Sequence, residues 1–93
     1  MEYTKGEWKL RQIRSGQLEV VADNKTIALI AQATKPEDAP EVLANAHLIV
    51  ASPKLLEACK DALRTFEARG IRPVDPRYLR LKEALAEVEG NDV

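Results

Sequence analysis

The chain has 93 residues, which is the size of one small domain. Its 14 basic and 15 acidic side chains give a net charge of −1, so it lacks the basic excess of a dedicated nucleic-acid binder. It shows no apolar signal core and no apolar run long enough to span a bilayer, so we expect a soluble cytoplasmic protein with no membrane partner.

The first third of the chain, residues 7–33, predicts a three-stranded antiparallel meander. Trp8 and Leu10 alternate with charged neighbours, as in a half-buried strand. Ile13 falls out of this alternation, which indicates a bulge or a strand end near Gln12.

Two turn signals separate the predicted strands. Ser15-Gly16 suits a two-residue turn, because glycine adopts positive φ at little cost. Asp23-Asn24-Lys25 suits a second turn, because Asp and Asn tolerate left-handed conformations. The third strand, Thr26–Ala31, is apolar on both faces, so we expect helices on one face and a further surface on the other. The middle strand places three apolar residues on one face: Leu18, Val20 and Ala22.

Proline positions predict where the first two helices begin. Thr34–Glu37 has the spacing of a capping box, and Pro40 suits a first helical turn, so we expect a turn at 35–39 and a helix over 40–51. Ser52-Pro53 then suits the cap and first position of a second helix over 53–69, hinged to the first.

The last helix has a clear start. Gly70 is a natural stop for the preceding helix, and Asp75-Pro76 repeats the cap-and-proline signal, so a helix is expected over 76–89. The predicted fold class is therefore α+β: a three-stranded antiparallel meander followed by two to three helices packed on one sheet face, in a single domain of residues 1–93. Ala46 is expected at a close contact between helix and sheet.

The sequence predicts no catalytic residue, no cofactor site and no metal site. His47 is the sole histidine, and it has no acidic residue three or four positions away. Cys59 is the sole cysteine and lies on the apolar stripe of its helix, as a buried thiol does. A catalytic pair would require these two residues to converge in one pocket, and we favour a structural role for both.

Four arginines around the last linker offer an alternative function, weak nucleic-acid binding. They are Arg69, Arg72, Arg77 and Arg80. Arginines can contact phosphates, but here they are interspersed with acidic residues, so we favour a solvated surface.

The run Ala44–Ala58, with the sequence ANAHLIVASPKLLEA, resembles a pattern of small bacteriophage and prophage proteins. That pattern reads Ala-Asn-Ala-x-Leu-Ile-Ala-Ala-x-Pro-x-Leu-Leu-Glu-Ala, and the strands upstream are similar as well. Val50 and Ser52 stand here where alanine is common, and His47 stands where arginine is common. The resemblance implies a phage or prophage protein and assigns no reaction to it.

The expected function follows from these observations. The small aliphatic core, the third strand with two apolar faces and the lack of a catalytic constellation favour a non-enzymatic accessory protein. We expect it to act through contact with an unknown protein partner and to form a homodimer.

Overall fold

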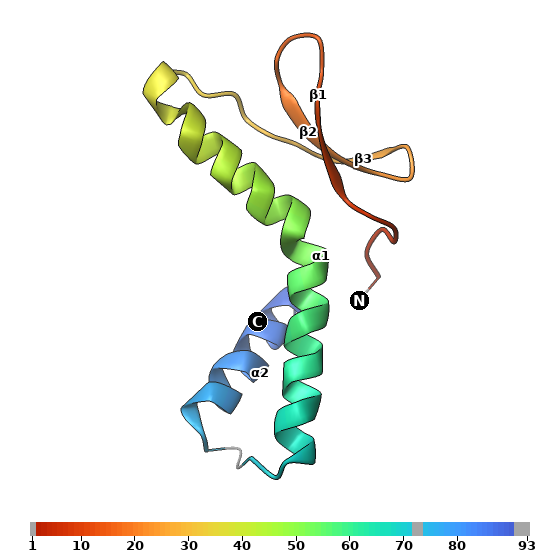
Figure 1. Ribbon diagram of the computed structural model, residues 1–93, viewed down its shortest axis with the longest axis vertical. Helices are drawn as coiled ribbons and strands as arrows, with labels where there is room; N and C mark the ends of the chain where they lie inside the picture. Colours follow the sequence, from red (N-terminus) through yellow and green to blue (C-terminus); the bar gives the residue numbers. More distant parts are fainter. Residues whose placement is uncertain (1, 72–73, 91–93) are drawn as a thin grey trace. The chain divides into compact units, whose positions relative to one another are not determined.

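The computed structural model describes residues 2–71 and 74–90, which form three strands, a short 3-10 helix and two α-helices (Figure 1). The strands precede the helices, which confirms the predicted α+β class. The chain divides into two compact units, Glu2–Pro53 and the residues from Lys54 onward. Within the described residues, no helix combines the length and apolar content needed to cross a bilayer.

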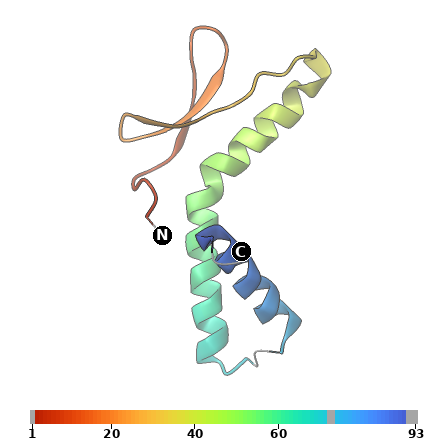
Figure 2. The same ribbon diagram turned by 180° about the vertical axis from the view of Figure 1, so that it is seen from behind.

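The first unit is built on a small antiparallel sheet, seen from two sides in Figures 1 and 2. Its strands are β1 (Lys9–Gln12), β2 (Leu18–Ala22) and β3 (Lys25–Leu29), in the spatial order β1-β2-β3. Each pairs with its sequence neighbour, as the turn signals predict. The end of β1 at Gln12 explains why Ile13 breaks the alternation.

The two turns of the sheet differ from each other. Asp23 and Asn24 have φ values of 48° and 65°, so the β2–β3 turn uses the left-handed conformations predicted for it. The β1–β2 connection is longer than the predicted two-residue turn. It runs from Ile13 to Gln17, closed by a 2.9 Å hydrogen bond from the Ile13 N–H to the Gln17 carbonyl, with Gly16 at a φ of 85°.

A β-bulge in β3 explains its apolar character on both faces. Val20 pairs with Ala28 while Val21 pairs with Thr26, which leaves Ile27 as an extra residue. Ile27 packs against the core cluster instead of continuing the alternation. The bulge therefore brings one more aliphatic side chain to the core.

The core of the first unit lies between β2 and the first half of the long helix. Val20 and Ala46 are fully buried, and Ile30 joins them. Ala46, expected at a contact between helix and sheet, is fully buried in the cluster with Val20 and Ile30. Partly buried side chains surround this cluster: Trp8, Leu10, Leu18, Ile27, Ala28, Val42, Ile49 and Val50.

A buried carboxylate lies on the opposite side of β2. Glu19 alternates with Val20 and is only 5 % exposed. The Arg11 guanidinium on the neighbouring strand donates hydrogen bonds to it from Nε, at 2.7 Å, and from Nη2. The Thr26 hydroxyl donates a third at 3.4 Å, so the buried charge is fully partnered.

The helical region begins with a 3-10 turn, Pro36–Asp38, followed by α1 (Ala39–Ala68). The capping box predicted at Thr34–Glu37 is not formed, because Lys35 occupies the cap position and makes no side-chain cap bond. The predicted break at Ser52-Pro53 is also wrong, since α1 continues through Pro53. A single helix thus replaces the two expected over 40–51 and 53–69.

The continuity of α1 has a local cause. Proline has no N–H, so Pro53 leaves the carbonyl of Ile49 without its helical donor. The Ser52 hydroxyl donates to that carbonyl at 2.7 Å. Ser52, which was expected to cap a new helix, therefore supplies the missing hydrogen bond within the continuous helix α1.

The second unit contains the rest of α1 and the helix α2 (Pro76–Glu89). Gly70, at a φ of 70°, ends α1 with two hydrogen bonds, from its own N–H to Glu67 and from the Ile71 N–H to Phe66, which is a Schellman motif. Asp75 caps α2 by accepting from the Arg77 N–H at 2.9 Å, as predicted.

Tyr78 anchors α2 to the second half of α1. Its ring is buried, and its hydroxyl donates to the Glu67 carboxylate at 3.2 Å. Among the described residues of this unit, Tyr78 is the one that is buried.

Candidate interaction surfaces

The outer edge of the sheet is the first candidate surface. β3 pairs with β2 on one side, and no other described strand lies beyond it. Leu29 at the end of β3 is 61 % exposed, and Ala31 and Gln32, which follow it, are exposed as well. The outer side of β3 is therefore not paired with another described strand, and these exposed residues lie at its end.

The charge pattern along this edge is distinctive. The nine residues Thr26–Thr34, here called the β3 edge segment, contain no charged side chain, although 31 % of the chain is charged. Lys25 and Lys35 flank the segment, and both are exposed. Neither lysine forms an ion pair with any residue in 2–71 or 74–90.

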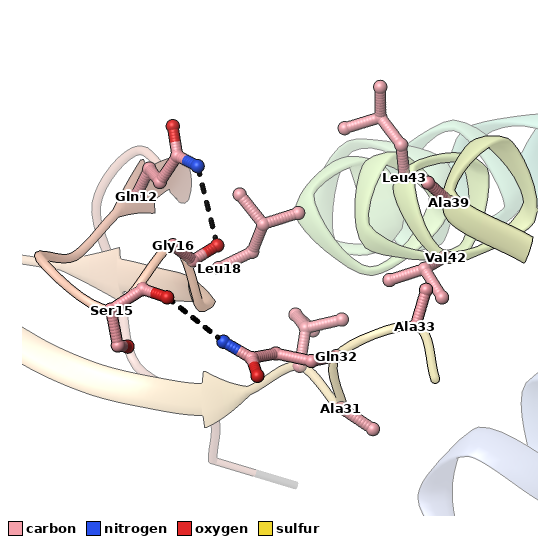
Figure 3. Close-up of a pocket in the computed structure, with 11 residues that line it drawn as sticks. Gln12, Ser15, Gly16, Leu18, Ala31, Gln32, Ala33, Ala39, Val42 and Leu43 are labelled. Carbon is pink, nitrogen blue, oxygen red and sulfur yellow. Dashed lines mark hydrogen bonds between the residues drawn. The ribbon is translucent and has the colours of Figure 1, made fainter. Parts of the chain in front are cut away.

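A groove lies beside the end of the β3 edge segment, with a volume of about 460 Å³ (Figure 3). Its wall on one side is α1, and on the other it is the β1–β2 loop. No lining residue carries a charge: Gln12, Ser15, Gly16, Leu18, Ile30, Ala31, Gln32, Ala33, Ala39, Val42 and Leu43. The groove suits uncharged, largely apolar groups.

Two glutamines supply the polar part of this groove. Gln32 donates from Nε2 to the Ser15 carbonyl, and Gln12 donates from Nε2 to the Gly16 carbonyl, both at 3.3 Å (Figure 3). The Gln32 bond ties the β1–β2 loop to the segment that follows β3, whereas the Gln12 bond ties the loop to the end of β1. The carboxamides thus shape the groove and are engaged by the protein's own backbone.

The four arginines proposed as phosphate contacts have different surroundings. Arg69 follows the end of α1 and Arg80 lies on α2, and both are exposed. Arg77 instead donates to both oxygens of the Asp75 carboxylate, from Nε at 3.1 Å and from Nη2 at 2.8 Å. Arg72 lies outside the described residues.

The hydrogen bonds between Arg77 and Asp75 make this arginine less available to a phosphate. The hydrogen bonds from Arg77 lower the pKa of Asp75 to about 2, so the carboxylate stays charged and holds the guanidinium. The same guanidinium lies over the Phe66 ring, 5.8 Å from its centroid. A phosphate would have to compete with both contacts for Arg77.

The two residues considered for catalysis belong to different units. His47 is exposed on α1 in the first unit, whereas Cys59 is partly buried on α1 in the second. Among the described residues, no group of three or more His, Cys, Asp or Glu side chains is arranged to hold a metal ion.

Large apolar side chains are exposed on both units. On the first unit, Leu48 of α1 is 63 % exposed, slightly more than Leu29 of β3. Sequence reasoning missed Leu48, although its position two residues after the buried Ala46 places it away from the stripe that meets the sheet. The others are Leu43, Leu55, Val74, Leu79 and Val88.

Comparison with known proteins gives one family. The family model described as Salmonella phage P22 protein Y8K6 matches residues 1–90, almost the whole chain. This match confirms the predicted resemblance at the level of a phage protein family. No curated protein and no solved structure matches the chain.

Proposed function

Because the chain belongs to the Salmonella phage P22 protein Y8K6 family, we propose that it is a phage accessory protein that acts through protein–protein contact. It works in the cytoplasm and catalyses no reaction of its own. The proposal includes self-association into a homodimer as well as contact with a further protein.

The observation that carries this proposal is the balance between buried and exposed apolar side chains. In the described part of the chain, seven large apolar side chains are exposed, whereas Val20 is the largest that is fully buried. A small domain with such a limited core gains stability by covering apolar surface with a partner. Protein–protein contact supplies that cover.

The homodimer is tested by sedimentation equilibrium over micromolar concentrations. We expect a dimer that Leu48→Lys shifts toward monomer, because a charge then replaces an apolar side chain that is 63 % exposed. His47→Lys is the matched control, since it places the same charge on the adjacent exposed residue. A monomer at every concentration would contradict the homodimer.

Weak nucleic-acid binding remains the second candidate, supported by the exposure of Arg69 and Arg80. It predicts salt-dependent binding to DNA or RNA that is weakened when Arg69 and Arg80 are replaced by alanine. Absence of binding at low salt would exclude it.

A further inference from the structure

We propose that the β3 edge segment binds an extended strand of another protein, uncharged along its centre and acidic at its ends. The inference rests on the proposed function, because it names the surface through which one protein–protein contact is made. It concerns an edge of the sheet, whereas the homodimer test concerns an exposed face of α1.

The main chain around Ile30 shows which groups this edge offers. The Ile30 N–H donates to the Leu18 carbonyl at 2.9 Å, and the Ile30 carbonyl accepts from Gln17 Nε2 at 3.3 Å. Both main-chain groups of Ile30 therefore face β2. Because these groups alternate in direction along an antiparallel strand, those of Leu29 and Ala31 face away from β2.

These outward groups form a template for strand addition. An unpaired row of N–H and C=O groups at a sheet edge pairs readily with another strand. The other edge, β1, is less suited, because Lys9 and Arg11 place two positive charges on its four residues. Charged side chains of this kind protect an edge from pairing, whereas β3 carries a single charge, Lys25 at its start, and the β3 edge segment has none.

The charges of Lys25 and Lys35 determine which kind of strand can pair with the β3 edge segment. If two copies of the β3 edge segment paired antiparallel over their full length, Lys25 would lie opposite Lys35 of the second copy, and like charges facing each other are destabilising. Carboxylates near both ends of an incoming strand would instead meet a lysine at each end. The charges therefore favour a strand of another protein with acidic ends.

The apolar surroundings define the centre of that strand. Leu29 is exposed on the face that also carries Glu19, and it gains a neighbour when a strand pairs beside it. On the other face, the uncharged groove adjoins Ile30 and Gln32 and accepts small or apolar side chains. A partner strand with alternating β-branched residues fits both faces.

A synthetic peptide tests the inference. The probe is a strand of nine alternating threonine and valine residues with one aspartate at each end, which matches the nine residues between Lys25 and Lys35, and the comparison peptide has lysine in place of aspartate. We expect the aspartate peptide to bind more tightly at low salt, by roughly fivefold, from two exposed ion pairs. In amide NMR spectra, the N–H signals of Leu29 and Ala31 should shift most.

Reversing the charges of Lys25 and Lys35 tests whether these two residues determine which peptide binds. In the double variant Lys25→Glu and Lys35→Glu, the preference should invert toward the lysine peptide, since both side chains are exposed and removable without loss of the fold. Lys9→Glu, on the opposite edge of the sheet, is the matched control and should leave the preference unchanged.

A backbone variant separates strand pairing from charge attraction. Ala31→Pro removes one outward N–H and should abolish binding of the aspartate peptide, with the sheet amide signals recording that the fold persists. If this variant unfolds, the amide shifts of the wild-type protein decide the question.

Three results would overturn the inference. They are no amide shift in the β3 edge segment with either peptide, shifts centred on β1, or the same preference for the aspartate peptide in the wild type and in the Lys25→Glu and Lys35→Glu double variant. These results are independent of the dimer test. If the protein is a monomer and binds the peptide, the strand-binding inference is supported and the homodimer is contradicted. If the protein is a dimer that Leu48→Lys dissociates and it does not bind the peptide, the homodimer is supported and the strand-binding inference is contradicted.

Discussion

Ser52 replaces the hydrogen bond that proline removes from α1. Its hydroxyl donates at 2.7 Å to the Ile49 carbonyl, the group that residue 53 would serve in an uninterrupted helix. The two adjacent residues thus form one unit: Pro53 creates an orphan acceptor and Ser52 satisfies it.

Removal of the serine hydroxyl should therefore weaken the protein in a way that depends on Pro53. Ser52→Ala is expected to lower the free energy of unfolding by about 0.5 to 1.5 kcal/mol, the typical net contribution of one hydrogen bond. In a Pro53→Ala background the same change should have almost no effect, because the main-chain N–H of the introduced alanine then donates to Ile49. Urea denaturation of the four proteins measures this coupling. Equal effects in both backgrounds would show that the Ser52 bond does not compensate for the proline.

The close contact at Ala46 should not tolerate a larger side chain. Ala46→Leu is expected to destabilise the fold by about 1 to 3 kcal/mol, because Ala46 is fully buried against Val20 and Ile30. Ala44→Leu is the matched control on an exposed position of the same helix and should change stability little. Thermal melting of the two variants compares them directly. An unchanged melting temperature for Ala46→Leu would contradict the packing of α1 on the sheet.

The buried carboxylate of Glu19 should make the sheet sensitive to loss of Arg11. Arg11→Ala removes two hydrogen bonds to a carboxylate that remains almost fully buried. We expect a loss of about 1 to 2 kcal/mol, less than for a fully buried ion pair because the Arg11 side chain is largely exposed. Lys9→Ala on the same strand serves as the reference, and a loss no greater than that of the reference would refute the prediction. Chemical denaturation at neutral pH is the measurement.

The Asp75–Arg77 pair should give stability a dependence on acid pH. The pKa of Asp75 is lowered from 3.8 to about 2, so its charge stabilises the folded protein above pH 3.8, and this contribution disappears as the pH falls through about 2. Asp75→Asn keeps a capping side chain but removes the charge. The difference in stability between the wild type and this variant should therefore shrink between pH 4 and pH 2.

An NMR titration of the Asp75 carboxyl isolates the cause of this dependence. In Arg77→Met the pKa of Asp75 should return toward its ordinary value, because the guanidinium hydrogen bonds lower it most. A pKa that stays near 2 in that variant would show that Arg77 does not set it.

Sequence reasoning succeeded where one residue decides the local structure. The positive φ values at Asp23 and Asn24, the stop at Gly70 and the cap at Asp75 each follow from the chemistry of the residue itself. The fold class followed from these boundaries and from the alternation of apolar residues.

It failed where two residues act together. The pair Ser52-Pro53 is compatible with the start of a new helix and also with a helix that continues through the proline. The acceptor of the Ser52 hydroxyl, which is the Ile49 carbonyl, distinguishes the two. The bulge at Ile27 depends likewise on how β3 pairs with β2, which is not encoded in β3 alone.

The candidate surfaces were only partly accessible from sequence. The apolar character of Thr26–Ala31 pointed to a second contact surface, and the structure places this segment at the sheet edge. The involvement of Arg77 with Asp75 and Phe66 was not visible, because it depends on the start of α2 and on its packing against α1.

The coupling between Ser52 and Pro53 also constrains the order in which this helix can change during evolution. A lineage that first replaces Pro53 keeps every carbonyl of that turn satisfied and then loses Ser52 freely. A lineage that first loses Ser52 passes through a less stable protein, which matters because folded domains are stable by only about 5 to 15 kcal/mol.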